Sequence, residues 1–461
     1  MFRRILIANR GEAAVRIVRA CRELGIESVL VYSEIDADTL GVKLADRAVC
    51  IGPAPELDSY RNIPRVLTGA EIASCDAVHP GYGFLAENSE FAEAVETCNL
   101  GWIGPKSETI RTLNDRLACR HRMKEIGVPV LPGSDQEITS AADARRLADQ
   151  IGYPIVFKPV VRSTKLWVVH KEKDLETTLR MAQGDSRATL NDARIYLERY
   201  LETCRALEVQ ILGTADGSTI QLFERECSIQ HRHEKILEEA PSPMVTGELR
   251  RQLGDWAVRA AQAVKYRNAG TVQFLADEAG KLYYLGIHAS LQPEHPVTEI
   301  LVGCDLVAEQ IRIAAGEAVS DEVRVGAALP AAAPHVIKCR INAEDAEKDF
   351  MPTSGVLTTV RLPGGPGVRV DTHVYSGYKG SALYDTLIAK ISVWDTTRDR
   401  AIARMERALQ ETVLEGVKTT LELQQKLLRL GAFRKGELST TLVGRELLGT
   451  RAGQWSKGAG E

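Results

Sequence analysis

The sequence lacks a hydrophobic run of the roughly 20 residues that span a bilayer. Its first residues, MFRRILIANRGEAA, carry only a short apolar run before Asn9 and Arg10 interrupt it. We therefore expect a soluble protein without a secretory signal. The chain also lacks a long Lys/Arg run and basic residues interleaved with aromatic ones, and its formal net charge is −4. This charge pattern does not favour a nucleic-acid partner.

Paired cysteines are missing as well. The 9 cysteines stand singly between Cys21 and Cys339, with no C-x-x-C pair and an odd total. Such a distribution fits reduced thiols in a cytoplasm better than a disulfide framework or a zinc site. We expect a cytoplasmic protein whose cysteines fill its core.

The 461 residues suffice for two or three domains. Residues 5–8 are apolar, residues 14–24 have apolar side chains at helical spacing, and residues 28–32 are apolar again. This strand–helix–strand pattern recurs through residues 76–79 and 101–103. It predicts a doubly wound parallel sheet of Rossmann-like type, with loops such as HPGYGFLAEN at its strand ends.

A second part follows a predicted helical stretch at residues 113–126, because the two prolines and the glycine of PVLPGSD mark a boundary. A small domain is predicted over residues 130–199, around a helix at residues 143–151. Its predicted strands lie near residues 155–158, 166–170 and 195–197.

The third part has hairpin signals. LEVQILGTADGSTIQLFERE turns at Asp216-Gly217, and GTVQFLADEAGKLYYLG turns around residues 277–281, which predicts an antiparallel sheet. An amphipathic helix between them has Thr246 as its expected N-cap. The segment ALPAAAPH, which follows Ala327, is predicted to connect to further strands and a helical part at residues 396–430. The Gly-rich residues 449–461 are expected to fray.

Long blocks of the chain resemble one family. They are IANRGEAAVRIVRACRELGI, AVHPGYGFLAENSEFAEAV, ERECSIQHRHEKILEEAP, PEHPVTEILVGCDLVAEQIRIAAGE and CRINAED. They resemble the biotin carboxylase subunit of acetyl-CoA carboxylase and its acyl-CoA and pyruvate carboxylase relatives, up to about Leu448. The resemblance implies an α/β (α+β) ATP-grasp fold with three domains. These are a Rossmann-like domain at residues 1–112, a lid with connecting helices at 113–203 and a C-terminal domain at 204–448.

The resemblance also implies an activity. The family uses ATP, Mg²⁺ and bicarbonate to make carboxyphosphate, and then carboxylates biotin held on a carrier protein. Implied partners are the biotin carboxyl carrier protein, carboxyltransferase subunits and, because the family dimerises, a second copy or an active paralogue.

The metal-binding positions of the family are changed here. Mg²⁺ takes oxygen ligands, generally with at least one protein carboxylate. The family has one glutamate in a G-T-x-E-F strand, where this chain has Gln273. It has another in an E-M-N-T-R run, where GIHAS places Gly286 for the glutamate and His288 for the asparagine. Ser290 replaces an arginine that holds bicarbonate, and such a donor typically contributes roughly 3 to 4 kcal/mol.

The lid loop also departs from the resemblance. The family has consecutive glycines whose backbone N–H groups approach the phosphates, whereas this chain reads FKPVVRSTKLWVVH. Lys158 remains, but residues 160–164 carry Cβ atoms and cannot form that cradle. Arg162 or Lys165 could still reach a phosphate.

Other positions match the family. The implied nucleotide contacts are Arg116, standing for a lysine, with Lys158, Glu198, Arg199, Leu201, Gln230 and His233. The implied residues for bicarbonate, general base and biotin enolate are Lys235, Gln292, Glu294 and Arg340. Two further changes are Ala206, for a histidine near the ribose, and Pro293, which has no N–H to give to bicarbonate.

Simpler interpretations stand beside these. Glu224 or Glu226 could take over the metal, and His288 could be a hydrogen-bonded structural residue or, with His233 or His295, hold another metal. Lys235, Glu294 and Arg340 could persist only as a salt-bridge network, HPGYGFLAEN is interpreted as a tight turn, and Arg10, Arg16, Arg19 and Arg22 are interpreted as a solvated helix face.

Three hypotheses follow. The first is a biotin-carboxylase-like subunit of an acyl-CoA (acetyl-CoA) carboxylase complex, catalytically impaired or non-catalytic, with a structural or regulatory role. The second is an active ATP-dependent biotin carboxylase with a rebuilt metal site. The third is a nucleotide-binding sensor without turnover.

Overall fold

A computed structural model describes residues 1–326 and 333–449. The predicted connection at ALPAAAPH falls largely outside this range, and the predicted frayed tail falls outside it beyond residue 449. Among the described residues, no helix combines the length and apolarity needed to cross a membrane.

The N-terminal domain is built on a five-stranded, wholly parallel sheet in the order β3-β2-β1-β4-β5. The strands are β1 (Arg4–Ile7), β2 (Glu27–Tyr32), β3 (Arg47–Cys50), β4 (Ala77–His79) and β5 (Gly101–Trp102). The helices are α1 (Gly11–Glu23), α2 (Leu40–Leu44), α3 (Ile63–Ile72), α4 (Ser89–Thr97) and α5 (Ser107–Leu113). The predicted Rossmann-like sheet is confirmed.

The helical stretch predicted at residues 113–126 is confirmed as a single helix, which a short break separates from α5. After α5, the carboxylate of Asp115 accepts the N–H of Ala118 at 2.8 Å and begins α6 (Arg116–Glu125). A side-chain cap satisfies the free N–H groups of a helix start, so it favours a new helix over continuation of the old one.

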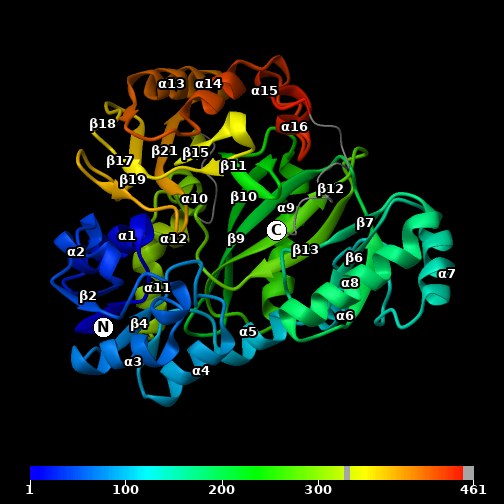
Figure 1. The fold of residues 1–461 in the computed structure, drawn as a ribbon, viewed down its shortest axis with the longest axis horizontal. Coiled ribbons are helices and arrows are strands. Elements are labelled where there is room, and N and C mark those ends of the chain that lie inside the picture. The colour runs from blue at the N-terminus through cyan, green and yellow to red at the C-terminus, as the bar shows by residue number, and fades with distance from the viewer. Residues whose placement is uncertain (327–332, 450–461) are drawn as a thin grey trace.

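The small lid domain projects from the rest of the molecule (Figure 1). Its three antiparallel strands run in the order β7-β6-β8 and are joined to two helices. The elements are α7 (Ala141–Ile151), β6 (Ile155–Pro159), β7 (Trp167–Val169), α8 (Leu175–Leu190) and β8 (Ile195–Arg199).

The C-terminal domain is built on an eight-stranded antiparallel sheet in the order β13-β12-β9-β10-β11-β14-β21-β19. Its strands are β9 (Arg205–Gly213), β10 (Thr219–His231), β11 (Glu234–Ala240), β12 (Asn268–Ala276), β13 (Leu282–His288), β14 (His335–Asn342), β19 (Val368–Thr372) and β21 (Leu387–Asp395). Its helices are α9 (Gly247–Ala263), α10 (His295–Val302), α11 (Leu306–Ala314), α12 (Asp321–Gly326), α13 (Arg398–Glu411), α14 (Leu421–Arg429), α15 (Gly431–Arg434) and α16 (Leu442–Glu446). Both predicted hairpins are confirmed, and Thr246 caps α9 by accepting the N–H of Leu249 at 3.3 Å.

Alternation along β9 separates the core from a polar face. Leu207, Val209 and Ile211 belong to the apolar cluster that includes α9. Glu208 points to the opposite face, because successive strand side chains alternate. This face of the sheet carries the charged residues described below.

The solvated face predicted for the first helix is wrong for two of its arginines. Arg16 is buried and pairs with Glu299 at 3.0 Å and with Asp305 at 2.5 Å. Arg10, at the N-cap of α1, makes two bonds to Asp36, at 2.7 and 2.8 Å. Packing of α1 against the C-terminal domain buries Arg16, and its partners lie more than 280 residues away in the sequence.

Candidate functional site

Three of the predicted site residues meet on neighbouring elements. Glu294 immediately precedes α10 and is 1% exposed, and its Oε1 lies 2.9 Å from Nζ of Lys235 on β11. Arg340, on the adjacent strand β14, donates a second bond to the same oxygen. Burial opposes ionisation of Glu294, but Lys235 and Arg340 outweigh it and hold the pKa of this carboxyl well below its usual range. The result is a carboxylate that stays ionised near neutral pH between two cations.

Glu208 extends this cluster and was not predicted from the sequence. Its carboxylate lies 2.5 Å from Nζ of Lys235 and 3.1 Å from Arg225. It also accepts the side-chain N–H of Gln273 at 2.9 Å. Burial opposes ionisation, but Lys235 and Arg225 outweigh it and lower the pKa of Glu208 to about 2. A charged residue within the apolar strand LEVQIL was the available signal.

Two of the three positions at which the family is expected to have metal ligands lie opposite each other. Gln273 on β12 and Gly286 on β13 are direct cross-strand partners. The Gln273 amide is engaged by Glu208, and a Cβ built on Gly286 would lie 3.9 Å from Oε1 of Gln273, an ordinary contact. The backbone therefore has room for a side chain at position 286.

The proposed substitute carboxylates are paired elsewhere. Glu224 lies 2.7 Å from Arg250, and Glu226 lies 2.8 Å from Arg205. Within residues 1–326 and 333–449, no group of three or more His, Cys, Asp or Glu side chains could hold a metal ion. At the two family positions, Gln273 and Gly286 themselves supply no carboxylate to a metal ion.

The end of β13 meets a carboxylate that was not predicted from the sequence. Oε1 of Glu87 accepts the hydroxyl of Ser290 at 3.0 Å and lies 3.2 Å from Nδ1 of His288. Gln292 donates to the Ser290 hydroxyl at 2.9 Å and to Glu87 at 3.4 Å. Arg162 of the lid loop completes the group, 3.6 Å from Glu87. His288 is thus held by hydrogen bonds, as its structural interpretation predicts.

Glu87 belongs to the HPGYGFLAEN loop. Gly81 and Gly83 have φ values of 64° and 70°, as a tight turn requires. The loop follows β4, and the carboxyl ends of parallel strands are where ligand sites form in such sheets. The position of this loop at the carboxyl end of a parallel strand is the feature of the sequence that could have pointed to Glu87 as a site residue.

Two of the predicted nucleotide residues, Lys158 and Glu198, bond each other, and most of the others have partners outside this set. Glu198 lies 2.7 Å from Lys158 and 2.9 Å from Arg120, and burial opposed by these two cations leaves its pKa below the usual value. Arg116 donates to the backbone carbonyl of Ser163 in the lid loop. The remaining members of this set lie on three segments. Arg199 ends β8 and donates to the Ile151 carbonyl at 3.1 Å, Leu201 follows β8, Gln230 pairs with Lys235 across β10 and β11, and His233 lies in the turn between those strands.

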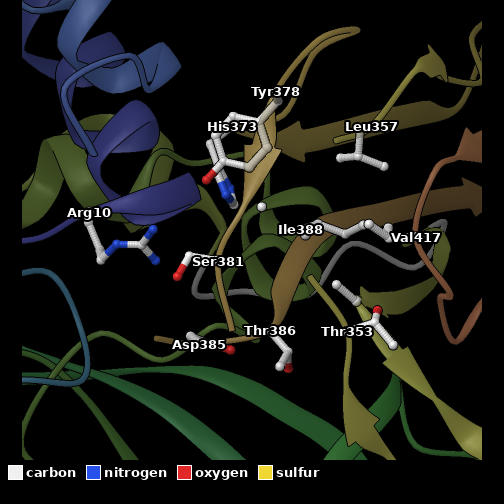
Figure 2. A pocket seen from close by; sticks show the side chains of 12 residues that line it. Arg10, Thr353, Leu357, His373, Tyr378, Ser381, Asp385, Thr386, Ile388 and Val417 are labelled. Carbon is white, nitrogen blue, oxygen red and sulfur yellow. The ribbon is translucent and has the colours of Figure 1, made fainter. Parts of the chain in front are cut away.

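Figure 2 shows a pocket that contains none of the predicted site residues. Arg10 approaches it from the N-terminal domain, and His373 and Tyr378 from the C-terminal domain. Arg10 is paired with Asp36, and burial lowers the pKa of His373 to about 4, so its imidazole is neutral. The arginine charge at this pocket is therefore balanced by the Asp36 carboxylate.

Three protein-family models match the chain in sequence order. The N-terminal domain of biotin carboxylase matches residues 1–110. The ATP-binding domain of the carbamoyl-phosphate synthase L chain matches residues 115–322. The C-terminal domain of biotin carboxylase matches residues 338–445.

Named relatives match over nearly the full length. Biotin carboxylase of Allochromatium vinosum is 46% identical over 95% of this chain and 96% of its own length. Biotin carboxylase 1 of Bacillus subtilis is 44% identical over 96% of this chain and 98% of its own. A pyruvate carboxylase subunit of Methanothermobacter thermautotrophicus is 46% identical over 96% of this chain and 90% of its own.

Solved structures agree. Biotin carboxylase from Campylobacter jejuni, as a β,γ-ATP complex, superposes with a TM-score of 0.92 at 38% identity, covering 96% of this chain and 99% of that one. The biotin carboxylase domain dimer of Hydrogenobacter thermophilus 2-oxoglutarate carboxylase, with MgADP, ADP and bicarbonate, has a TM-score of 0.90 at 38% identity, covering 96% and 98%. The predicted ATP-grasp fold is confirmed, and the chain belongs to the biotin carboxylase family.

Proposed function

We propose that the chain is the biotin-carboxylase-type subunit of a cytoplasmic acyl-CoA (acetyl-CoA) carboxylase complex, with ATP-dependent carboxylation impaired or absent and a structural or regulatory role. The observation that carries this proposal is the cross-strand pair Gln273 and Gly286, which puts an amide and no side chain where the family has two glutamates. The proposed partners are the biotin carboxyl carrier protein, carboxyltransferase subunits and an active biotin carboxylase paralogue.

The second candidate is an active biotin carboxylase with a rebuilt metal site. The comparisons support it better than they support the impaired subunit, because relatives at 43–46% identity are named biotin carboxylase or as part of pyruvate carboxylase. The cluster of Lys235, Glu294 and Arg340 also favours it, since it retains an ionised base between two cations. Glu87, beside His288, offers a carboxylate for such a site.

The cluster of Lys235, Glu294 and Arg340, called the base end below, has the same proposed roles under both candidate functions. Lys235 and Arg340 place two positive charges beside Glu294. In the proposed reaction these cations would attract an anion such as bicarbonate, and Glu294 would accept its proton. Ser290 supplies a neutral hydroxyl where the family has an arginine, and its hydroxyl already donates to Glu87.

The deciding experiment measures ADP release by the purified protein with MgATP, bicarbonate and free biotin, beside Bacillus subtilis biotin carboxylase 1. We expect a biotin-dependent rate at least about a hundredfold below the control, since loss of one preorganised donor alone costs about 10²- to 10³-fold. A rate within about a hundredfold of the control supports the active enzyme instead.

The subunit role has its own test. The tagged full-length chain is purified from its native cells, and its bound partners are identified by mass spectrometry. A biotin carrier, a carboxyltransferase or an active paralogue is the expected result. Absence of all three contradicts the subunit role, whatever the rate of ADP release.

A further inference from the structure

In the loop between β6 and β7, residues 160–166, one lid side chain contacts two other domains. The guanidinium of Arg162 donates to the backbone carbonyl of Ile287 and lies 2.7 Å from Nδ1 of His288, both on β13. The same guanidinium lies 3.6 Å from Glu87, on the loop that follows β4. Arg162 thereby joins the lid, the C-terminal sheet and the N-terminal domain.

The other polar contacts of this loop stay within the lid and its connecting helices. The Arg162 N–H donates to the Asn114 carbonyl at 2.9 Å, and the Arg116 N–H donates to the Val160 carbonyl at 2.9 Å. Lys165 lies 2.8 Å from Asp185 on α8. These contacts fix the base of the loop, whereas the Arg162 side chain ties it to the opposite wall of the cleft.

The tie is a contact between charges. Burial opposes ionisation of Glu87, but Arg162 and His288 outweigh it and hold the pKa of its carboxyl below its usual range. Arginine stays protonated at every pH at which proteins fold. Loss of the guanidinium would leave Glu87, which is partly enclosed, without its permanent cation, and an unpaired charge in such a place is costly.

We propose that Arg162 is a latch that holds residues 160–166 against β13 and Glu87. Its guanidinium lies against the end of β13, at Ile287 and His288. An incoming phosphate must draw Arg162 away from Glu87 before the loop opens, since a guanidinium pairs with carboxylate and phosphate alike. This inference rests on the proposed function only in taking the cleft as a nucleotide cleft.

Hydrogen exchange followed by mass spectrometry tests the latch in the full-length protein without nucleotide. In Arg162→Ala, we expect amides of residues 160–169 and 287–290 to exchange at least about tenfold faster, while β9 exchanges as in the unchanged protein. The matched control is Arg146→Ala, which removes an exposed lid arginine whose partner, Asp143, lies on its own helix. The control should exchange as the unchanged protein does.

Glu87→Gln tests the same contact from its other side. It keeps the size of the side chain and removes its charge, so we expect faster exchange in the same segments by a smaller factor. If Arg162→Ala does not fold by circular dichroism, Glu87→Gln decides alone. Unchanged exchange in the folded variant overturns the latch. Because no ATP, biotin or partner is present, this result stands whether the chain is an active ligase or an impaired subunit.

Discussion

The two ends of the cleft solve the problem of buried charge in opposite ways. At the base end, Glu294 is enclosed with Lys235 and Arg340, so its charge is balanced by the protein itself. At the phosphate end, Gln273 and Gly286 are neutral. Carboxylates that are balanced only by a bound metal repel each other once the metal is lost. A carboxylate held by the chain's own cations, such as Glu294, has no such dependence on a metal.

Glu294→Gln is the strongest way to break the base end. Glu294→Gln removes the carboxylate that Lys235 and Arg340 share, while Lys235 keeps Glu208 and Arg340 keeps Glu238. We therefore expect a loss of about 1.5–3 kcal/mol in the free energy of unfolding. The shift in urea midpoint, followed by tryptophan fluorescence, measures it. The control is Glu234→Gln, an exposed residue beside Lys235, with an expected change within about 0.5 kcal/mol. Equal midpoints for the two variants would contradict a stabilising role of the cluster.

A second test restores the residues expected in the family at Gln273, Gly286 and Ser290, the positions at the phosphate end. In the triple variant Gln273→Glu, Gly286→Glu and Ser290→Arg, we expect biotin-dependent ADP release to rise about 10²- to 10³-fold, the effect of one preorganised donor. A Cβ at position 286 would meet Oε1 of Gln273 at 3.9 Å, an ordinary contact. The same triple change combined with Glu294→Gln should show no rise. A triple variant no faster than the unchanged protein would mean that the base end alone cannot support the reaction.

Acid titration sharpens the link between the two ends, because Glu208 contacts both Lys235 and Gln273. Its pKa is lowered in the folded chain from 4.5 to about 2, against the effect of burial and through Lys235 and Arg225. The folded state therefore binds fewer protons than the unfolded state between these values. Stability from Glu208 is complete above about pH 4.5 and is lost as the pH falls towards 2. In Glu208→Gln, urea midpoints measured across this range should fall less steeply; an unchanged slope would contradict the shift.

The smallest effect is expected on the outer side of the lid. Lys165 and Asp185 form an ion pair whose side chains are 27% and 38% exposed. Solvent screens such a pair, so Lys165→Ala should change the free energy of unfolding by less than about 1 kcal/mol. Urea unfolding monitored by circular dichroism measures it. If Lys165→Ala lowered the free energy of unfolding as much as Glu294→Gln does, burial would not explain the difference between the buried cluster and this exposed pair.

Several features of this site were predictable from short stretches of sequence. The hairpin at Asp216-Gly217 and the cap at Thr246 are local, since turn and cap residues act on the backbone next to them. The missing carboxylates at Gln273 and Gly286 were equally predictable, because family motifs align by position along the chain. The proposed roles of Glu294 and its partners stay predictions until activity is measured.

The tertiary structure alone decided the partners of the charged side chains. The sequence by itself determined the order of strands and helices and the family, and it placed Gln273 and Gly286 on the two paired strands, because each depends on residues close together in the chain. It could not pair Arg162 with Glu87 and His288, which come from three domains and meet only when these pack around the cleft. Arg16 was assigned to a solvated face for the same reason, since its carboxylate partners lie on a distant segment. Long charged side chains reach whatever the packing of domains brings to them, and local pattern carries no record of it.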